Sequence, residues 1–186
     1  MTGCHVIWHF CDLDHVMHHR QAMSKFLRPN YLDASALVKL VVNEEYSARV
    51  RDYVLAPAQS WRICTSYCFT EALGVLKGKL HRCELTEKGY IATSRKLIRL
   101  LKQNTVRLIE QDFPHRLAFG DAERLVKSHG IDFLDAFQLV SIRESWSYLA
   151  PPSKPLLITA DRPLYKAAEA EGLLVWFCRE THQPRC

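Results

Sequence analysis

No stretch of the sequence is apolar over the length needed to cross a lipid bilayer. The N-terminal segment contains Asp12, Asp14 and five histidines where a signal peptide would have an unbroken apolar core. Both absences argue against a membrane-anchored or exported protein, and we therefore expect a cytoplasmic one with no membrane partner.

Paired cysteine motifs are also absent. The seven cysteines are odd in number and lack zinc-ribbon spacing, which argues against a disulfide framework and favours a reducing compartment. The chain has no internal repeat, no low-complexity tract and no linker between domains. Its 186 residues can bury one core but are few for two ordinary domains, so we expect a single domain.

The composition is that of an ordinary globular protein, with 48% hydrophobic and 24% charged residues and a mean hydropathy of −0.15. General disorder is therefore not expected. The net charge of +5 is compatible with a polyanionic partner but does not require one. Most of this charge lies between Lys77 and Arg107, where nine lysines and arginines and two glutamates give a net charge of +7.

Residues 1–27 differ from the rest of the chain, because they are rich in histidine and cysteine and show no helical or strand periodicity. Such side chains can bind zinc or copper, but no pair here has a recognised structural spacing. We expect a poorly ordered extension over residues 1–27, one domain over residues 28–180 and a polar tail over residues 181–186.

Beyond Pro29, short apolar runs alternate with helical patterns. Strands are predicted at 31–32, 61–65, 106–109, 156–160 and 173–177. The helices include one capped by Ser35, one over 44–54 capped by Asn43, one beginning at Ser66 and one over 86–103. A helical region ends at Gly130, another helix begins at 132–135, and the last ends at Gly172. This alternation predicts an α/β protein, with a mostly parallel central sheet covered by helices on both faces in three layers.

Four carboxylates are expected to meet at one edge of that sheet. Asp33 and Asp161 directly follow predicted strands, and the loops beyond the carboxyl ends of parallel strands frame a crevice. Glu71 and Asp135 lie on helices that leave the same edge. Each acid alone has an ordinary explanation as a helix cap, a dipole partner or a surface residue. Together they would repel one another, so some must hold protons or all need a cation.

The candidate ligands are oxygen atoms only, since Ser35 and Thr159 add hydroxyl groups to the carboxylates. Oxygen ligands favour Mg²⁺ or Mn²⁺ over zinc or copper. Carboxylate-bound Mg²⁺ usually keeps water and accepts phosphate oxygens as further ligands. The pattern therefore indicates phosphodiester chemistry.

Four segments in order carry a family resemblance: Tyr-Leu-Asp33-Ala-Ser35-Ala-Leu-Val-Lys-Leu, Thr-Ser-Tyr-Cys-Phe-Thr-Glu71-Ala-Leu, Leu-Asp135-Ala-Phe-Gln-Leu and Ile-Thr-Ala-Asp161. Together they resemble the PIN-domain nucleases, and among these the VapC-type toxins of toxin–antitoxin pairs, over residues 29–178. The resemblance implies a PIN-like fold and a metal-dependent endoribonuclease that hydrolyses RNA, with one or two Mg²⁺ or Mn²⁺ ions held by Asp33, Glu71, Asp135 and Asp161. Ser35 and Thr159 would have supporting roles.

The resemblance further implies a cognate antitoxin and a homodimer. Asp132 lies three residues before Asp135 and can share or replace its ligand role. On the 86–103 helix, Ile91, Ile98 and Leu101 are expected on one side and a basic stripe on the solvent side. The stripe is either an RNA-backbone contact or an ordinary solvated face, and comprises Lys88, Arg95, Arg99 and Lys102.

Two alternatives remain open from the sequence. One is a housekeeping PIN nuclease that acts in RNA processing or on DNA, with no antitoxin. The other is a PIN-like module that binds RNA or protein without catalysis.

Overall fold

The computed structural model describes residues 28–56, 60–109, 116–147 and 154–180. The predictions made for residues 1–27 and 181–186 lie outside these described residues. None of the described helices is both long and apolar enough to cross a membrane.

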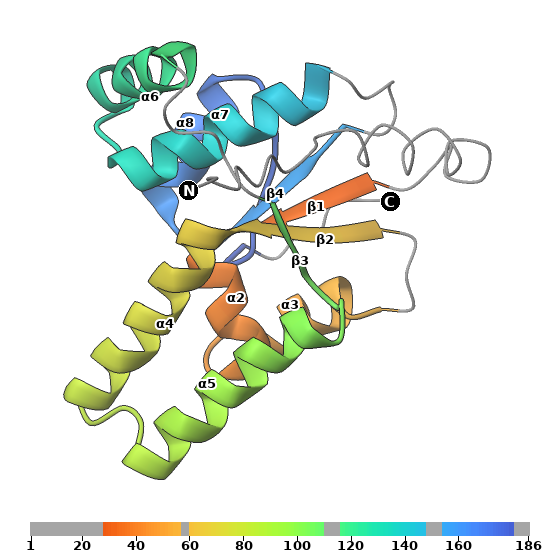
Figure 1. The fold of residues 1–186 in the computed structure, drawn as a ribbon, viewed down its shortest axis with the longest axis vertical. Helices are drawn as coiled ribbons and strands as arrows, with labels where there is room; N and C mark the ends of the chain where they lie inside the picture. The colour runs from red at the N-terminus through yellow and green to blue at the C-terminus, as the bar shows by residue number, and fades with distance from the viewer. Residues whose placement is uncertain (1–27, 57–59, 110–115, 148–153, 181–186) are drawn as a thin grey trace, which may run out of the picture.

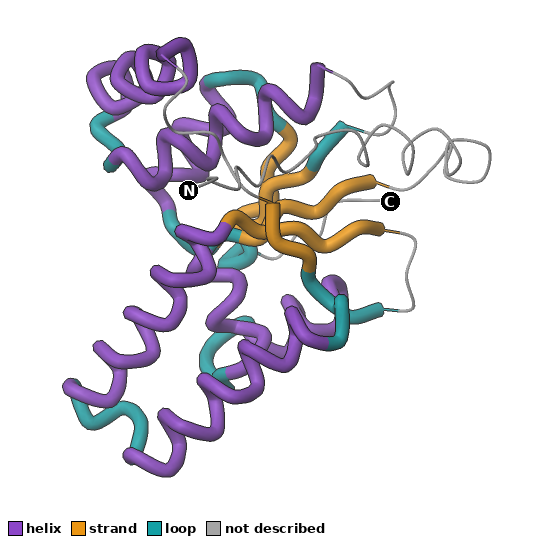
Figure 2. The backbone as a smooth tube through the Cα atoms, viewed as in Figure 1, coloured by secondary structure: helices purple, strands orange, loops and turns teal. Residues whose placement is uncertain are grey.

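Five strands form one sheet in the order β3-β2-β1-β4-β5, and every pair of neighbours is parallel (Figures 1 and 2). The predicted parallel sheet is therefore confirmed. The strands are β1 Arg28–Leu32, β2 Ser60–Thr65, β3 Arg107–Ile109, β4 Leu156–Thr159 and β5 Leu174–Phe177.

Helices fill each connection between consecutive strands. They are α2 Ala34–Val41, α3 Ser47–Val54, α4 Ser66–His81, α5 Glu87–Lys102, α6 Arg116–His129, α7 Phe133–Ser147 and α8 Arg162–Ala170. Helices α2 to α5 contribute to one buried cluster and α6 to α8 to another, on opposite faces of the sheet (Figure 1). The three-layer α/β/α arrangement is thus confirmed.

Side chains of the central strands alternate between the two clusters. Leu32 and Ile158 belong to the cluster with α2 to α5, whereas Tyr31 and Leu157 belong to the cluster with α6 to α8. Successive residues of a strand point to opposite faces, so an apolar run such as 156–159 supplies both cores.

The strand order places a topological switch at the centre of the sheet. From β1 the chain moves to β2 and then β3 on one side, while β4 and β5 lie on the other side of β1. A crevice forms beyond the carboxyl ends of the two strands at such a point. Asp33 and Asp161 follow β1 and β4, so both acids lie at this crevice.

Two predicted helix starts were wrong. The N-cap of α2 is Asp33, whose side chain accepts from the Ala36 N–H, and not Ser35. Helix α3 begins at Ser47 and not at Glu44, because the left-handed backbone of Tyr46 interrupts the helical path. Lys39 also donates to the Glu44 carboxylate and the Glu45 carbonyl oxygen in the segment before it.

The predicted inward face of α5 was also partly wrong. Ile91 and Ile98 are 43% and 40% exposed, whereas Thr93 and Leu97 are buried. Thr93 tolerates burial because its hydroxyl donates to backbone carbonyl oxygens of the preceding turn. Leu101 is partly buried against the core, as predicted.

Candidate functional site

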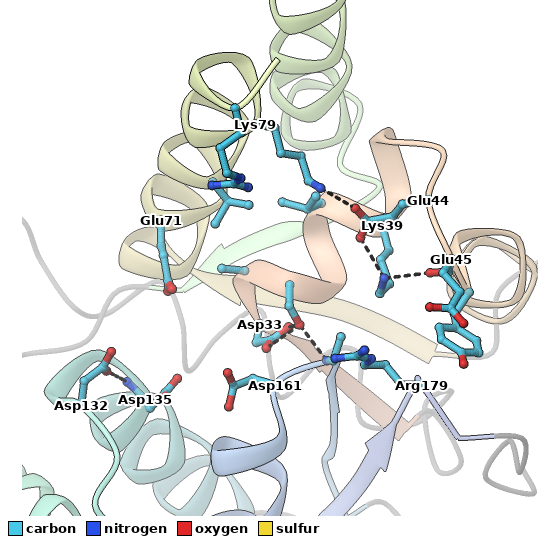
Figure 3. A pocket seen from close by; sticks show the side chains of 17 residues that line it. Asp33, Lys39, Glu44, Glu45, Glu71, Lys79, Asp132, Asp135, Asp161 and Arg179 are labelled. Atoms are coloured by element: carbon cyan, nitrogen blue, oxygen red, sulfur yellow. Dashed lines mark hydrogen bonds and ion pairs between the residues drawn. The ribbon is translucent and has the colours of Figure 1, made fainter. Parts of the chain in front are cut away.

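A pocket of about 520 Å³ opens at the crevice beyond β1 and β4. The four predicted acids, together with Asp132, all line it, and they come from separate segments of the chain (Figure 3). Asp33 and Asp161 come from the turns after β1 and β4, Glu71 from α4, and Asp132 and Asp135 from the start of α7. The expectation that distant carboxylates share one edge of the sheet therefore agrees with the structure.

Asp33 is the most buried of these acids, with 4% exposure. Its Oδ1 accepts from the Ala36 N–H at 2.7 Å, and its Oδ2 accepts from the Thr159 hydroxyl at 2.5 Å. The Ser35 hydroxyl lies 2.9 Å from both carboxylate oxygens. Burial raises the pKa of Asp33 to about 6, although these hydrogen bonds act in the opposite direction.

Ser35 and Thr159 connect the turn after β1 to the turn after β4. Ser35 Oγ accepts from the Ala160 N–H at 2.7 Å, and Thr159 Oγ1 accepts from the Asp161 N–H at 2.8 Å. Each hydroxyl then donates to Asp33. Both therefore orient the Asp33 carboxylate, and their supporting role at a metal site stays a prediction.

Glu71 and Asp135 have pKa values raised further. Burial and the negative charges of Asp33, Asp132 and Asp161 raise the pKa of Glu71 to about 7. Burial and the negative charges of Asp132, Asp161, Asp33 and Glu71 raise the pKa of Asp135 to about 8. The cluster thus resists full ionisation near neutral pH unless a cation enters it.

Three of the acids also cap helices. Asp33 caps α2, and Asp161 Oδ1 accepts from the Leu164 N–H at the start of α8. Asp132 Oδ1 accepts from the Asp135 N–H at the start of α7, at 2.9 Å. The ordinary explanation for such acids is therefore correct as local structure. Capping by Asp132 and Asp161 uses one carboxylate oxygen each, so their place in the pocket is compatible with a second role.

One wall of the pocket is basic, and no pattern in the sequence predicted it. Its cations are Lys39, Lys79, Arg82 and Arg179. Lys39 is only 6% exposed and lies 2.8 Å from Glu44, which also pairs with Lys79 at 2.8 Å. Although burial raises the pKa of Glu44, hydrogen bonds from the two lysines lower it below its usual value. The sequence sign of this basic wall is Lys39, a single lysine within the apolar run 36–42.

The cations of this wall differ in their pairing. Lys79 and Arg82 both pair with Glu84, at 2.9 and 2.6 Å. Arg179 directly follows Cys178 at the end of β5 and forms no ion pair with a described carboxylate. Arg179 is thus the pocket cation whose charge is available to a ligand.

The predicted basic stripe on α5 is exposed, as expected, but does not line the acidic pocket. Its residues are Lys88, Arg95, Arg99 and Lys102. Lys88 and Arg95 instead border a separate shallow hollow together with Ile91. An RNA contact along this stripe stays a prediction.

The donor chemistry of the pocket suits a hard divalent cation, because its acidic groups are carboxylates and neither His nor Cys is among its lining residues. Within the described part of the chain, however, no three His, Cys, Asp or Glu side chains are already arranged to hold a metal ion. Mg²⁺ usually retains several waters and binds through one or two carboxylates, so a wider arrangement is compatible with it.

No family model and no curated protein matches the chain. Among solved structures, the crystal structure of PAE2754 from Pyrobaculum aerophilum is similar, with a TM-score of 0.53 and 21% identity over 83% of this chain and 91% of that one. At this level of identity, the similarity shows a shared α/β fold.

Proposed function

We propose that this protein is a Mg²⁺- or Mn²⁺-dependent endoribonuclease, with Asp33, Glu71, Asp135 and Asp161 as its metal-binding and catalytic residues. The observation that carries the proposal is the gathering of Asp33, Glu71, Asp132, Asp135 and Asp161 on one side of the pocket, where their mutual repulsion favours the binding of a cation. A pocket of this charge needs such a cation before a phosphodiester can approach.

Each side chain has a definite task in this proposal. A bound divalent ion would supply an activated water and would offset charge on the phosphate oxygens. Asp33 is held in one orientation by Ser35, Thr159 and the Ala36 N–H. Glu71 and Asp135 form no hydrogen bond through their carboxylates to other described side chains, so they can turn toward the ion. Asp132 caps α7 and is the further candidate ligand.

The toxin role and the cognate antitoxin rest on the motif resemblance. An antitoxin would keep such a nuclease inactive by covering its acidic pocket. Expression of the protein alone is then expected to arrest growth. A short antitoxin gene is expected to precede its reading frame, and co-expression of that gene is expected to relieve the arrest. Arrest that persists with Glu71→Gln would show that RNA cleavage is not its cause.

The enzymatic proposal is tested by incubating the purified protein with end-labelled RNA and DNA strands of matched sequence. RNA cleavage is expected with Mn²⁺ and not with EDTA. Asp33→Asn and Glu71→Gln are expected to lower the rate by at least about 100-fold, or about 2.7 kcal/mol of transition-state stabilisation. Asn also serves as an N-cap, so Asp33→Asn keeps the start of α2.

Asp52→Asn, at an exposed position of α3 outside the pocket, is the matched control and is expected to keep full activity. Cleavage of DNA alone would mean that the protein is a deoxyribonuclease and not a ribonuclease. Mn²⁺-dependent RNA binding without cleavage of either strand would instead favour the non-catalytic module. Equal activity of wild type and Glu71→Gln would refute the assigned site.

A further inference from the structure

Arg179 lies on the side of the pocket opposite Glu71 and Asp132 (Figure 3). Its side chain is exposed, and it has no carboxylate partner among the described residues. The other three cations of the pocket wall are paired with Glu44 or Glu84. An unpaired guanidinium at the edge of an acidic pocket is suited to a phosphate that lies outside the metal-binding centre.

Tyr46 lines the same side of the pocket and has an unusual backbone. Its φ of 65° and ψ of 0° are left-handed, although it is neither glycine nor asparagine. It occupies the N-cap position of α3 but makes no capping hydrogen bond through its side chain. Helix capping therefore does not account for a tyrosine here, and glycine would adopt this conformation at lower cost.

Arg49 joins these two features. Its guanidinium carbon lies 5.5 Å from the centroid of the Tyr46 ring, and its guanidinium also donates to the Glu180 carbonyl oxygen. Glu180 directly follows Arg179 in the chain. The contact of Arg49 with the ring thus holds the ring near the β5 end, on the side of the pocket that Tyr46 lines.

We propose that Tyr46 and Arg179 form a nucleotide subsite for single-stranded RNA, in which Arg179 binds a backbone phosphate and Tyr46 stacks on a base of the same strand. The proposal rests on the proposed ribonuclease function, because it places this strand across the acidic pocket. A cation beside an aromatic ring is the combination that proteins use for single strands, whose bases are free to stack. A duplex would present its phosphates but keep its bases away from the ring.

The test measures equilibrium binding by fluorescence anisotropy with two labelled probes. One is a ten-nucleotide oligouridylate, and the other is an abasic strand with the same number of phosphates. Ca²⁺ is present, and a gel confirms that the probes stay intact.

Tyr46→Gly keeps the left-handed backbone and removes the ring. It is expected to weaken oligouridylate binding by about 5- to 100-fold and to leave abasic binding unchanged, whereas Tyr46→Phe binds both as wild type does.

Arg179→Gln is expected to weaken binding of both probes and to lower the slope of log affinity against log salt by about 0.7, the loss of one phosphate contact. Arg179→Lys keeps that slope. Arg162→Gln is the matched control, because Arg162 is also exposed, directly follows Asp161 and does not line the pocket. It removes the same charge and is expected to leave the slope within about 0.2 of wild type.

Equal losses on both probes for Tyr46→Gly would overturn the stacking role, and a salt slope for Arg179→Gln equal to that of Arg162→Gln would overturn the phosphate role. If wild type cleaves RNA while these variants bind as wild type does, only the subsite is wrong. If wild type neither binds nor cleaves RNA, both the subsite and the proposed function fail.

Discussion

The Asp33 side chain belongs both to the local structure around α2 and to the acidic pocket. It caps α2, accepts hydrogen bonds from Ser35 and Thr159, and lines the acidic pocket. The two hydroxyls donate to it and accept from backbone N–H groups of the turn after β4. The sequence indicates that Ser35 and Thr159 belong with this acid, whereas the bonds by which Thr159 joins Asp33 to the Asp161 N–H appear only in the folded chain.

The raised pKa values predict how stability depends on pH without metal. Asp33, Glu71 and Asp135 move from ordinary values of 3.8, 4.5 and 3.8 to about 6, 7 and 8 in the folded protein. The folded state therefore binds more protons than the unfolded state between about pH 4 and pH 8. Through these groups, the free energy of unfolding falls as pH rises across that window.

Urea unfolding in EDTA at pH 5 and pH 8 measures this slope. Asp135→Asn is expected to make it shallower, because the amide does not titrate. Mn²⁺ is expected to raise stability more at pH 8 than at pH 5, since the acids are then ionised and bind it. A stability that rises from pH 5 to pH 8 equally in wild type and Asp135→Asn would contradict the assignment.

At the scale of the elements, ionic contacts between α2, the turn after it and α4 shape the basic wall of the pocket. Lys39 and Lys79 share the Glu44 carboxylate, and Lys39 is almost completely buried. Glu44→Gln removes the charge between them, and it is expected to destabilise the protein by about 1–3 kcal/mol, because a buried lysine loses its counter-charge.

Glu123→Gln is the matched control. Glu123 pairs with Lys127 on the exposed side of α6, where side chains are 45% and 72% exposed, so the change is expected to cost less than about 0.5 kcal/mol. Urea unfolding measures both variants. If Glu44→Gln and Glu123→Gln lowered the free energy of unfolding equally, burial of Lys39 would not make its ion pair with Glu44 more stabilising than an exposed pair.

At the scale of the whole molecule, we propose an exposed aromatic patch as the interface of the homodimer that the resemblance implies. Phe119 of α6 and Phe133 of α7 are 50% and 40% exposed, and their rings stack at 5.6 Å. Leu134 beside them is also exposed. Apolar patches of this kind are typical of protein interfaces. Light scattering with size exclusion is expected to give twice the chain mass of 21.5 kDa for wild type and the monomer mass for Phe119→Glu.

Ile91→Glu tests a second exposed apolar surface, on α5, and is expected to leave the dimer intact. A monomeric wild type at micromolar concentration would contradict the homodimer. If Ile91→Glu dissociated the dimer and Phe119→Glu did not, the dimer interface would lie on α5.

Patterns local in the chain were enough to predict the strands, most of the helices and the four acids. Period-two and helical spacing reflect which face of an element is buried, and an acid directly after a strand stays at its carboxyl end whatever the strand order. The parallel arrangement then follows from alternation, because parallel strands need long connections. The meeting of Asp33 and Asp161 was predictable for this reason.

Features that depend on partners far away in sequence were decided only by the tertiary structure. The inward side of α5 is set by its packing against α2 and α4, so Ile91 faces solvent although its spacing suggests a core position. The pairing of Lys39 and the contact of Arg49 with Glu180 join segments that no local pattern connects. Local patterns were therefore enough to predict most elements and the acids that follow them. Side-chain packing and charge pairing between distant segments decided which cations border the pocket, because these energies exist only once the chain is folded.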